Sequence, residues 1–197
     1  NWTVSWIGAS TFFTCAPFLY SVGFPHRAWP CILISALLHV VYLGLLARAY
    51  HLNELSFAYP IARGASPLLV TLGGLIAASE LPRLAQGLGI LAIVGGIAII
   101  GLESKHWDPL GFRIALATGF VIACYTVVDA IGARMSHGSA QYNVWCFSTY
   151  GFLVLLLNLK RGGFQSLKGP RKRLLLAIGG GVTSVVAYMI VTWAMVR

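Results

Sequence analysis

The sequence predicts an all-α, polytopic membrane protein with about seven transmembrane helices. Of its 197 residues, 58% are hydrophobic and only 10% are charged, and the mean hydropathy is +0.80. Soluble domains carry about 25% charged residues. The apolar runs are continuous and do not alternate, which excludes a closed β-barrel. A transmembrane helix needs roughly 20 apolar residues, and the segments that qualify are 4–24, 28–47, 55–79, 84–102, 110–133, 142–159 and 174–196.

Polar residues mark four of these segments as candidates for lining a cavity. The first and sixth segments have aromatic residues near the expected membrane interfaces, Tyr20 and Trp145. The fourth is uncharged and rich in glycine, which lets helices approach closely in lipid, so we interpret it as a packing helix. The second segment carries His39 and Tyr42, and the third carries Tyr59 and Arg63. The fifth carries Tyr125 and Asp129, and the seventh carries Tyr188 and Trp193.

The third segment places an arginine between two prolines. At a rise of about 1.5 Å per residue, Arg63 lies about 12 Å into the span, close to the middle of the bilayer. An arginine there costs about 3 kcal/mol on insertion scales. Pro60 and Pro67 each remove a backbone donor and free a carbonyl oxygen. Such a backbone is tolerated at membrane depth where it lines a cavity or is buried in protein.

The spacing of these residues predicts a single functional face. Ser56, the adjacent pair Tyr59 and Pro60, then Arg63 and Pro67 follow one another at intervals of three or four residues, so they share one side of a helix. We expect this face to line a substrate path, and the guanidinium group favours an anionic or zwitterionic substrate, because it binds carboxylate and phosphate bidentately. The alternative is a structural arginine, hydrogen-bonded to the freed carbonyls or to an acid on a neighbouring helix.

Asp129 is the only acid inside a predicted segment. Three roles are open: an ion pair with Arg63, the binding of a coupling proton, or contact with interfacial water beside Arg134. Tyr125 lies one turn before it on the same helix. The remaining candidates for the substrate path are Tyr42, Tyr188 and Trp193, because they are the polar aromatic residues of the other candidate helices.

Other functional classes gain no support from the sequence. The four cysteines lie inside predicted segments without CxxC spacing, and the five histidines form no HExxH motif, so we expect no disulfide, metal or other cofactor. An intramembrane enzyme would need a nucleophile, an acid–base pair or a metal site. The sequence offers no such constellation, and we expect the chain not to be an enzyme.

The net charge of +9 is concentrated in one loop, KRGGFQSLKGPRKR (160–173), which holds six of the fourteen Lys and Arg residues. Basic loops of this kind follow the positive-inside rule and contact anionic lipid headgroups. We therefore expect the lipid bilayer, and no nucleic acid, as the partner of this loop. The alternative is a basic site for a soluble partner.

A weak internal repeat relates the second segment, ALLHVVYLGLLARAY (36–50), to the seventh, GVTSVVAYMIVTWAMVR (181–197), with Tyr42 aligned on Tyr188. The two are five segments apart, so the second copy of such a repeat would be inverted in the membrane, as is typical of secondary transporters. The run LSFAYPIARGASPLLVTLGGLIAASELPRLAQGLGILAIVGGIAIIG, with the proline of ASPLL, Glu80 at a helix end and a glycine-rich helix after it, resembles the fourth and fifth helices of EamA-type transporters. ALATGFVIACYTVVDAIGARMS (115–136) is similar to the helix that opens the second repeat of that family.

The resemblance implies the ten-helix, inverted-repeat (5+5) fold of the drug/metabolite transporter superfamily. Residues 1–102 would then be the end of the first repeat and 110–197 the start of the second, with three helices outside this chain. The implied function is a secondary transporter that moves a small organic metabolite, such as an amino acid or organic anion, by alternating access. Its expected partners are that substrate, the bilayer of the cell membrane (a bacterial inner membrane) and a coupling proton. The alternatives are a folded fragment that does not transport and an intramembrane enzyme.

Loop charges predict how the chain is oriented. Loops 48–54, 103–109 and 160–173 fall on one side and hold most of the Lys and Arg residues, whereas the opposite loops hold only Arg27, Arg83 and Arg134. The positive-inside rule then places 160–173 in the cytoplasm. The usual cytoplasmic N-terminus of the family, with one helix missing ahead of residue 1, would place it outside.

We expect a single cysteine introduced into 160–173 of a cysteine-free variant to be protected from an impermeant thiol reagent in intact cells, and to react after permeabilisation. His137→Cys, in an opposite loop, should show the reverse pattern. Labelling of the basic loop in intact cells would contradict the charge rule and support the orientation expected from the family.

Overall fold

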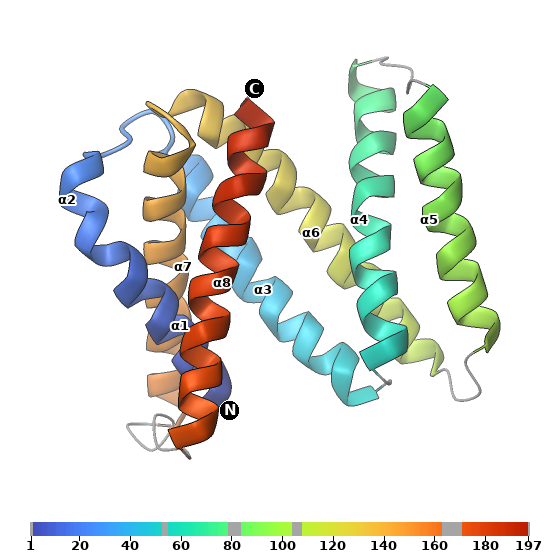
Figure 1. Cartoon of the computed structure of the whole chain (residues 1–197), viewed down its shortest axis with the longest axis horizontal. Helices are drawn as coiled ribbons and strands as arrows, with labels where there is room; N and C mark the ends of the chain where they lie inside the picture. Colours follow the sequence, from blue (N-terminus) through green and yellow to red (C-terminus); the bar gives the residue numbers. More distant parts are fainter. Residues whose placement is uncertain (1, 53–54, 79–83, 104–107, 163–170, 197) are drawn as a thin grey trace. The chain divides into compact units, whose positions relative to one another are not determined.

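The structure is a computed structural model that describes residues 2–52, 55–78, 84–103, 108–162 and 171–196 (Figure 1). Glu80, Arg83 and most of the basic loop lie outside these residues. The described chain is helical with short turns. Its elements are α1 (Trp2–Cys15), η1 (Ala16–Phe18), α2 (Leu19–Val22), α3 (Trp29–Leu52), α4 (Leu55–Ala78), α5 (Leu84–Glu103), α6 (Pro109–Met135), α7 (Ser139–Gly162) and α8 (Arg171–Val196).

The chain is a helical membrane protein. Among the described residues, four helices are long and apolar enough to cross a bilayer: Trp29–Leu52, Pro109–Met135, Ser139–Lys160 and Leu174–Val196. The prediction of an all-α fold is thus confirmed for the described chain, and each predicted segment from the second to the seventh corresponds to one helix. The count of seven spans and the ten-helix repeat stay predictions.

The first predicted segment, 4–24, is wrong as a single continuous helix. α1 ends at Cys15, a 3-10 turn follows over Ala16–Phe18, and α2 is only four residues long. Pro17 lies in that turn and lacks the backbone N–H that a continuing α-helix requires. Gly23 then takes a positive φ of 69°, which ends α2.

The helices form two compact units, each built from parts distant in the sequence. The first unit comprises Asn1–Val40 and Val128–Arg197, and the second comprises Val41–Val127. α3 and α6 therefore contribute residues to both units. The two units are groups of residues that pack together. The division of the chain into two repeats, 1–102 and 110–197, stays a prediction.

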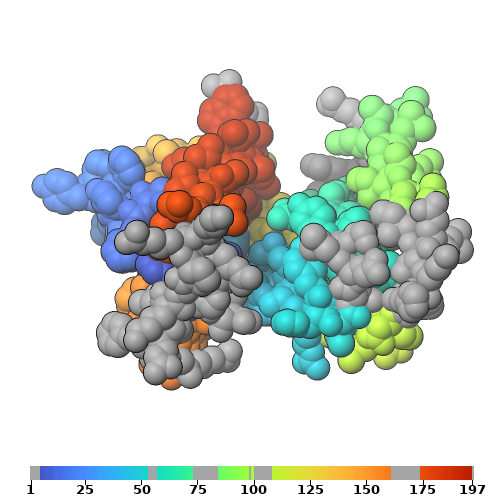
Figure 2. Space-filling model, turned by 60° about the horizontal axis from the view of Figure 1, so that its bottom comes forward, coloured from blue at the N-terminus to red at the C-terminus, as the bar shows by residue number. Residues whose placement is uncertain are grey.

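In the first unit, α1 packs against α7 and α8, and glycines set the spacing. Figure 1 shows the three helices side by side, and the blue surface of α1 lies against the red surface of α8 in Figure 2. A Cβ atom on Gly151 of α7 would lie 2.7 Å from both the Gly8 carbonyl oxygen and the Phe12 backbone nitrogen of α1. On the α8 side, the Ser10 hydroxyl donates a hydrogen bond to the Ala177 carbonyl at 3.4 Å. The helices thus meet at small residues, as helices in lipid commonly do.

A second cluster of the first unit joins α3, α6 and α7. Gly132 of α6 leaves room for the ring of Tyr142, which lies against the α6 backbone. Gly138, with a φ of 136°, makes the tight turn that returns the chain from α6 to α7. The buried members of this cluster are Ala28, Ile32, Ala133, Tyr142 and Cys146.

The second unit is organised around α4. Gly64 faces the side chains of Ile93 and Ile97 on α5, and Gly119 of α6 lies where a Cβ atom would be 2.9 Å from the Ala62 carbonyl oxygen. The buried side chains of α4 pack into two small clusters with α3, α5 and α6. On another face of α4, which we call its open side, Tyr59, Arg63 and Pro67 are exposed among the described residues.

Gly151→Ala should destabilise the protein by about 1–3 kcal/mol, because the added methyl group would collide with backbone atoms that have no rotamer to change. Gly180→Ala is the matched control, since a Cβ atom at Gly180 of α8 meets nothing within 4 Å. Thermal unfolding of the purified protein in detergent, followed by circular dichroism, measures both. Equal stability of the two variants would contradict backbone contact between α1 and α7.

Candidate functional site

The open side of α4 carries the residues that the sequence placed on one face. Tyr59, Arg63 and Pro67 are exposed and Pro60 is half-buried, whereas Ile61 and the small residues around it are buried. The exposed and the buried residues lie on different sides of α4 because the helix has 3.6 residues per turn. The predicted common face is therefore present in the folded chain, although its role in a substrate path stays a prediction.

Three tyrosines from three helices lie around Arg63, and we call these four residues the arginine site. The guanidinium carbon lies 5.6 Å from the ring centre of Tyr59 on α4, within the range of a cation–π interaction. Tyr42 of α3 also lies near enough to the guanidinium group of Arg63 to interact with it electrostatically. The Tyr42 ring packs edge-on against the buried Tyr125 of α6, with 5.8 Å between ring centres. Tyr42, Tyr59, Arg63 and Tyr125 are thus brought together in the second unit.

Tyrosine partners hold the guanidinium without cancelling its charge. A phenol hydroxyl is neutral at ordinary pH, so it satisfies a guanidinium N–H while the positive charge remains. Among the described side chains of the second unit, the one carboxylate is that of Asp108, and it accepts a hydrogen bond from the Gly111 amide at 2.7 Å, at the start of α6. The arginine site therefore suits an anionic group of a ligand, with aromatic rings beside it.

α4 remains one helix through both prolines. Pro60 and Pro67 lie inside the span Leu55–Ala78, and Figure 1 draws it as one continuous ribbon. One turn after Pro67, the Thr71 hydroxyl donates a hydrogen bond to the Pro67 carbonyl at 2.8 Å. The two prolines remove donors that would otherwise bond to the carbonyls one turn earlier. The predicted kink and polar patch at these carbonyls stay predictions.

Asp129 lies in the first unit, and its carboxylate is held by two tyrosines. The side chain is completely buried (0% exposed). Tyr142 of α7 donates a hydrogen bond to Oδ1 at 2.7 Å, and Tyr188 of α8 donates one to Oδ2. These bonds tie α6, α7 and α8 together at one point. We call Asp129, Tyr142 and Tyr188 the aspartate site.

His39 of α3 extends the aspartate site. It is only 6% exposed, and its ring lies 5.7 Å from that of Tyr188, edge to face. Its Nδ1 atom is 2.9 Å from the Ser35 carbonyl oxygen, one turn earlier on α3. The Ser35 hydroxyl in turn accepts a weak hydrogen bond from the Cys146 thiol at 3.5 Å. An acid and a base are therefore buried in the same tyrosine-containing cluster.

Arg63 and Asp129 each have tyrosine partners within their own unit. The ion pair considered between them stays a prediction. Arg134, which was expected to share interfacial water with Asp129, is exposed and donates a hydrogen bond to the Met195 carbonyl at 3.3 Å.

Sequence reasoning missed Tyr142 and the pair Asn143–Thr192. Asn143 is buried and donates a hydrogen bond to the Thr192 hydroxyl, which links α7 to α8 beside the aspartate site. Residues 142 and 143 start a predicted span, where a tyrosine is usually an interfacial anchor. The sequence signal that could have indicated these residues is the mostly polar stretch SAQYN (139–143), because a transmembrane segment rarely begins with so many polar side chains.

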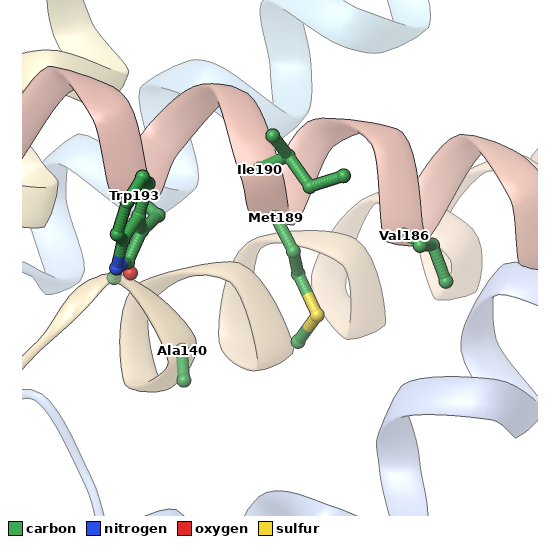
Figure 3. A pocket seen from close by; sticks show the side chains of 6 residues that line it. Ala140, Val186, Met189, Ile190 and Trp193 are labelled. Carbon is green, nitrogen blue, oxygen red and sulfur yellow. The ribbon is translucent and has the colours of Figure 1, made fainter.

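Trp193 lines an apolar groove on the first unit. Figure 3 shows Met189 and Trp193 pointing from α8 toward α7, where Ala140 forms the other wall. The groove has a volume of about 420 Å³, and Ser139 is its only polar lining residue. Such a lining offers no charge to an ionic substrate, so Trp193 has the weakest connection to the predicted substrate path.

Within the described residues, no group of three or more His, Cys, Asp and Glu side chains could hold a metal ion. The four cysteines are free thiols. A scan against models of protein families, a search of curated proteins and a search of solved structures found no match to this chain. The helices define its class as a helical membrane protein, and the similarity to EamA-type transporters stays a prediction.

Tyr142→Phe should destabilise the protein by about 1–3 kcal/mol, because a buried carboxylate oxygen loses its donor. Tyr20→Phe removes the same hydroxyl from a side chain that is 99% exposed, and should change stability by about 0.5 kcal/mol or less. Thermal unfolding in detergent compares the two. A Tyr142→Phe variant as stable as Tyr20→Phe would show that this hydrogen bond does not hold the helices together.

Proposed function

We propose that the chain is part of a secondary transporter that moves a small organic metabolite with an anionic or zwitterionic group across the membrane by alternating access. The observation that carries this proposal is the arginine site. An exposed arginine lies on a membrane-protein helix, beside the ring of Tyr59 and close to Tyr42. Its positive charge remains available to a ligand.

The free energy of placing an arginine in a bilayer depends on what surrounds its guanidinium group. A guanidinium group near the middle of a helix costs about 3 kcal/mol. A static structural role would favour burial of the group against protein acceptors, whereas Arg63 is on the open side of α4. In this position the guanidinium group is not covered by the described chain, and its fork of N–H donors suits a carboxylate or phosphate.

The family proposal has a separate basis in the sequence. The run of residues 55–101 resembles two consecutive helices of EamA-type transporters, and the echo between the helices of Tyr42 and Tyr188 suits an inverted repeat. On this proposal the complete transporter has ten helices, seven of them in this chain, and resides in the cell membrane. The substrate path includes Arg63, Tyr59, Tyr42 and Tyr125.

Arg63→Leu should give a stable protein that no longer transports, because the costly charge and the anion-binding fork are both removed. Arg63→Lys keeps the charge but not the bidentate geometry, so uptake should fall about tenfold or more, as for the loss of a charge-assisted hydrogen bond. The full-length gene product in proteoliposomes is assayed with a panel of radiolabelled amino acids and organic acids. Expression and thermal stability are measured in parallel.

Arg113→Leu is the matched control, because Arg113 is exposed near the start of α6 and belongs to neither site. It should transport like the wild type. Normal uptake by Arg63→Leu would refute the substrate path. An unstable Arg63→Leu protein that Asp129→Asn rescues would identify Arg63 as a structural residue paired with Asp129.

A further inference from the structure

The aspartate site buries an acid that has neutral hydroxyl partners. Asp129 is 0% exposed, and both of its carboxylate oxygens accept hydrogen bonds from tyrosines. Placing a charge in a low-dielectric interior is costly unless it is paired. Ionisable residues inside a membrane protein are rare for this reason, and they mark proton pathways in many transporters.

A tyrosine hydroxyl can be the hydrogen-bond partner of this carboxyl group in either protonation state, as donor to the carboxylate or as acceptor from the carboxylic acid. When Asp129 is ionised, the hydroxyls of Tyr142 and Tyr188 donate to its two oxygens, as the structure shows. When one oxygen carries a proton, that O–H can donate to a tyrosine oxygen, because a phenol hydroxyl both donates and accepts. The helices do not need to move for the change, and an arginine or lysine partner, which cannot accept, would not permit it.

We propose that Asp129 is a reversible proton-binding site. A proton taken from water adds to one carboxylate oxygen, and the O–H so formed donates a hydrogen bond to a tyrosine hydroxyl; no other bond is made or broken. Tyr188 is the half-buried member of the site, whereas Tyr142 and Asp129 are buried. This inference does not depend on the transport function proposed above.

Each helix that packs at the site presents titratable groups to it. His39 is the nearest base, and its ring contacts that of Tyr188. His39 is itself buried, so an acid and a base lie in the same cluster. The titratable groups that face Asp129 are Tyr142 and Cys146 on α7, Tyr188 on α8, and Cys31 and His39 on α3.

The competing interpretation is a permanent structural tie. In that case Asp129 stays ionised at every pH at which the protein is folded, and the tyrosines only join α6, α7 and α8. Infrared spectroscopy separates the two, because a protonated carboxyl group has its own carbonyl stretching band. The chain has only five Asp and Glu residues, so few groups contribute.

The experiment records infrared difference spectra of the purified wild-type chain in liposomes between acidic and alkaline pH. We expect a pH-dependent carboxyl band that is lost in Asp129→Asn and kept in Asp108→Asn, whose carboxylate caps the start of α6. Tyr188→Phe keeps the carboxyl group but removes one hydrogen-bond partner, so it should retain the band at a shifted frequency. This variant decides the question even if Asp129→Asn does not fold.

Two results would overturn the proposal. One is a wild-type difference spectrum that coincides with that of Asp129→Asn. The other is a Tyr188→Phe spectrum in which the carboxyl band keeps the wild-type frequency, because the titrating carboxyl group would then belong to another residue.

Discussion

Tyrosine side chains contact Asp129 in the first unit and Arg63 in the second, and much of the structure depends on these contacts. Inside the hydrocarbon region of a bilayer, the polar groups of a protein need partners within the protein. The carboxylate of Asp129 accepts hydrogen bonds from Tyr142 and Tyr188, and the guanidinium group of Arg63 lies beside the ring of Tyr59 and near Tyr42. Each ionisable side chain is therefore positioned by partners whose side chains are uncharged phenols.

A charged group with tyrosine partners differs from a charged group in a buried ion pair. Opposite charges in contact satisfy one another, and the pair then has little affinity for a third charged species. A tyrosine can be displaced or reoriented for the loss of one hydrogen bond, about 1 kcal/mol net. The proposed anion binding at Arg63 and the proposed proton binding at Asp129 both draw on this property of tyrosine partners.

Local geometry explains what could be predicted from the sequence. Hydropathy located α3 to α8, because a helix in lipid needs a long apolar run and little else. The common face of Tyr59, Arg63 and Pro67 followed from helical periodicity alone. The break after Cys15 was overlooked, although Pro17 and Gly23 signalled it, because the apolar run continues through them.

Tertiary contacts could not be predicted in the same way. Tyr142 donates to Asp129 only because Gly132 lets its ring lie against α6, and no pattern within either helix encodes that pairing. Tyr42 and Tyr125 were predicted as candidates for the substrate path, but their common position beside Arg63 depends on how α3 and α6 pack on α4. In a membrane protein, the pattern of apolar residues does not show which side of a helix faces the protein interior. The lipid and the protein interior are equally apolar, so both sides of the helix carry apolar residues.

The break between α1 and α3 has a consequence for the order in which the chain is made. Its carbonyl groups at Val22 and Gly23 accept hydrogen bonds from the Gln141 side chain, at 2.8 and 3.3 Å, and Gly23 also accepts one from the Trp145 indole at 2.8 Å. Those donors leave the ribosome more than a hundred residues after their acceptors. The carbonyl groups of Val22 and Gly23 are therefore synthesised well before the α7 donors with which they form these hydrogen bonds.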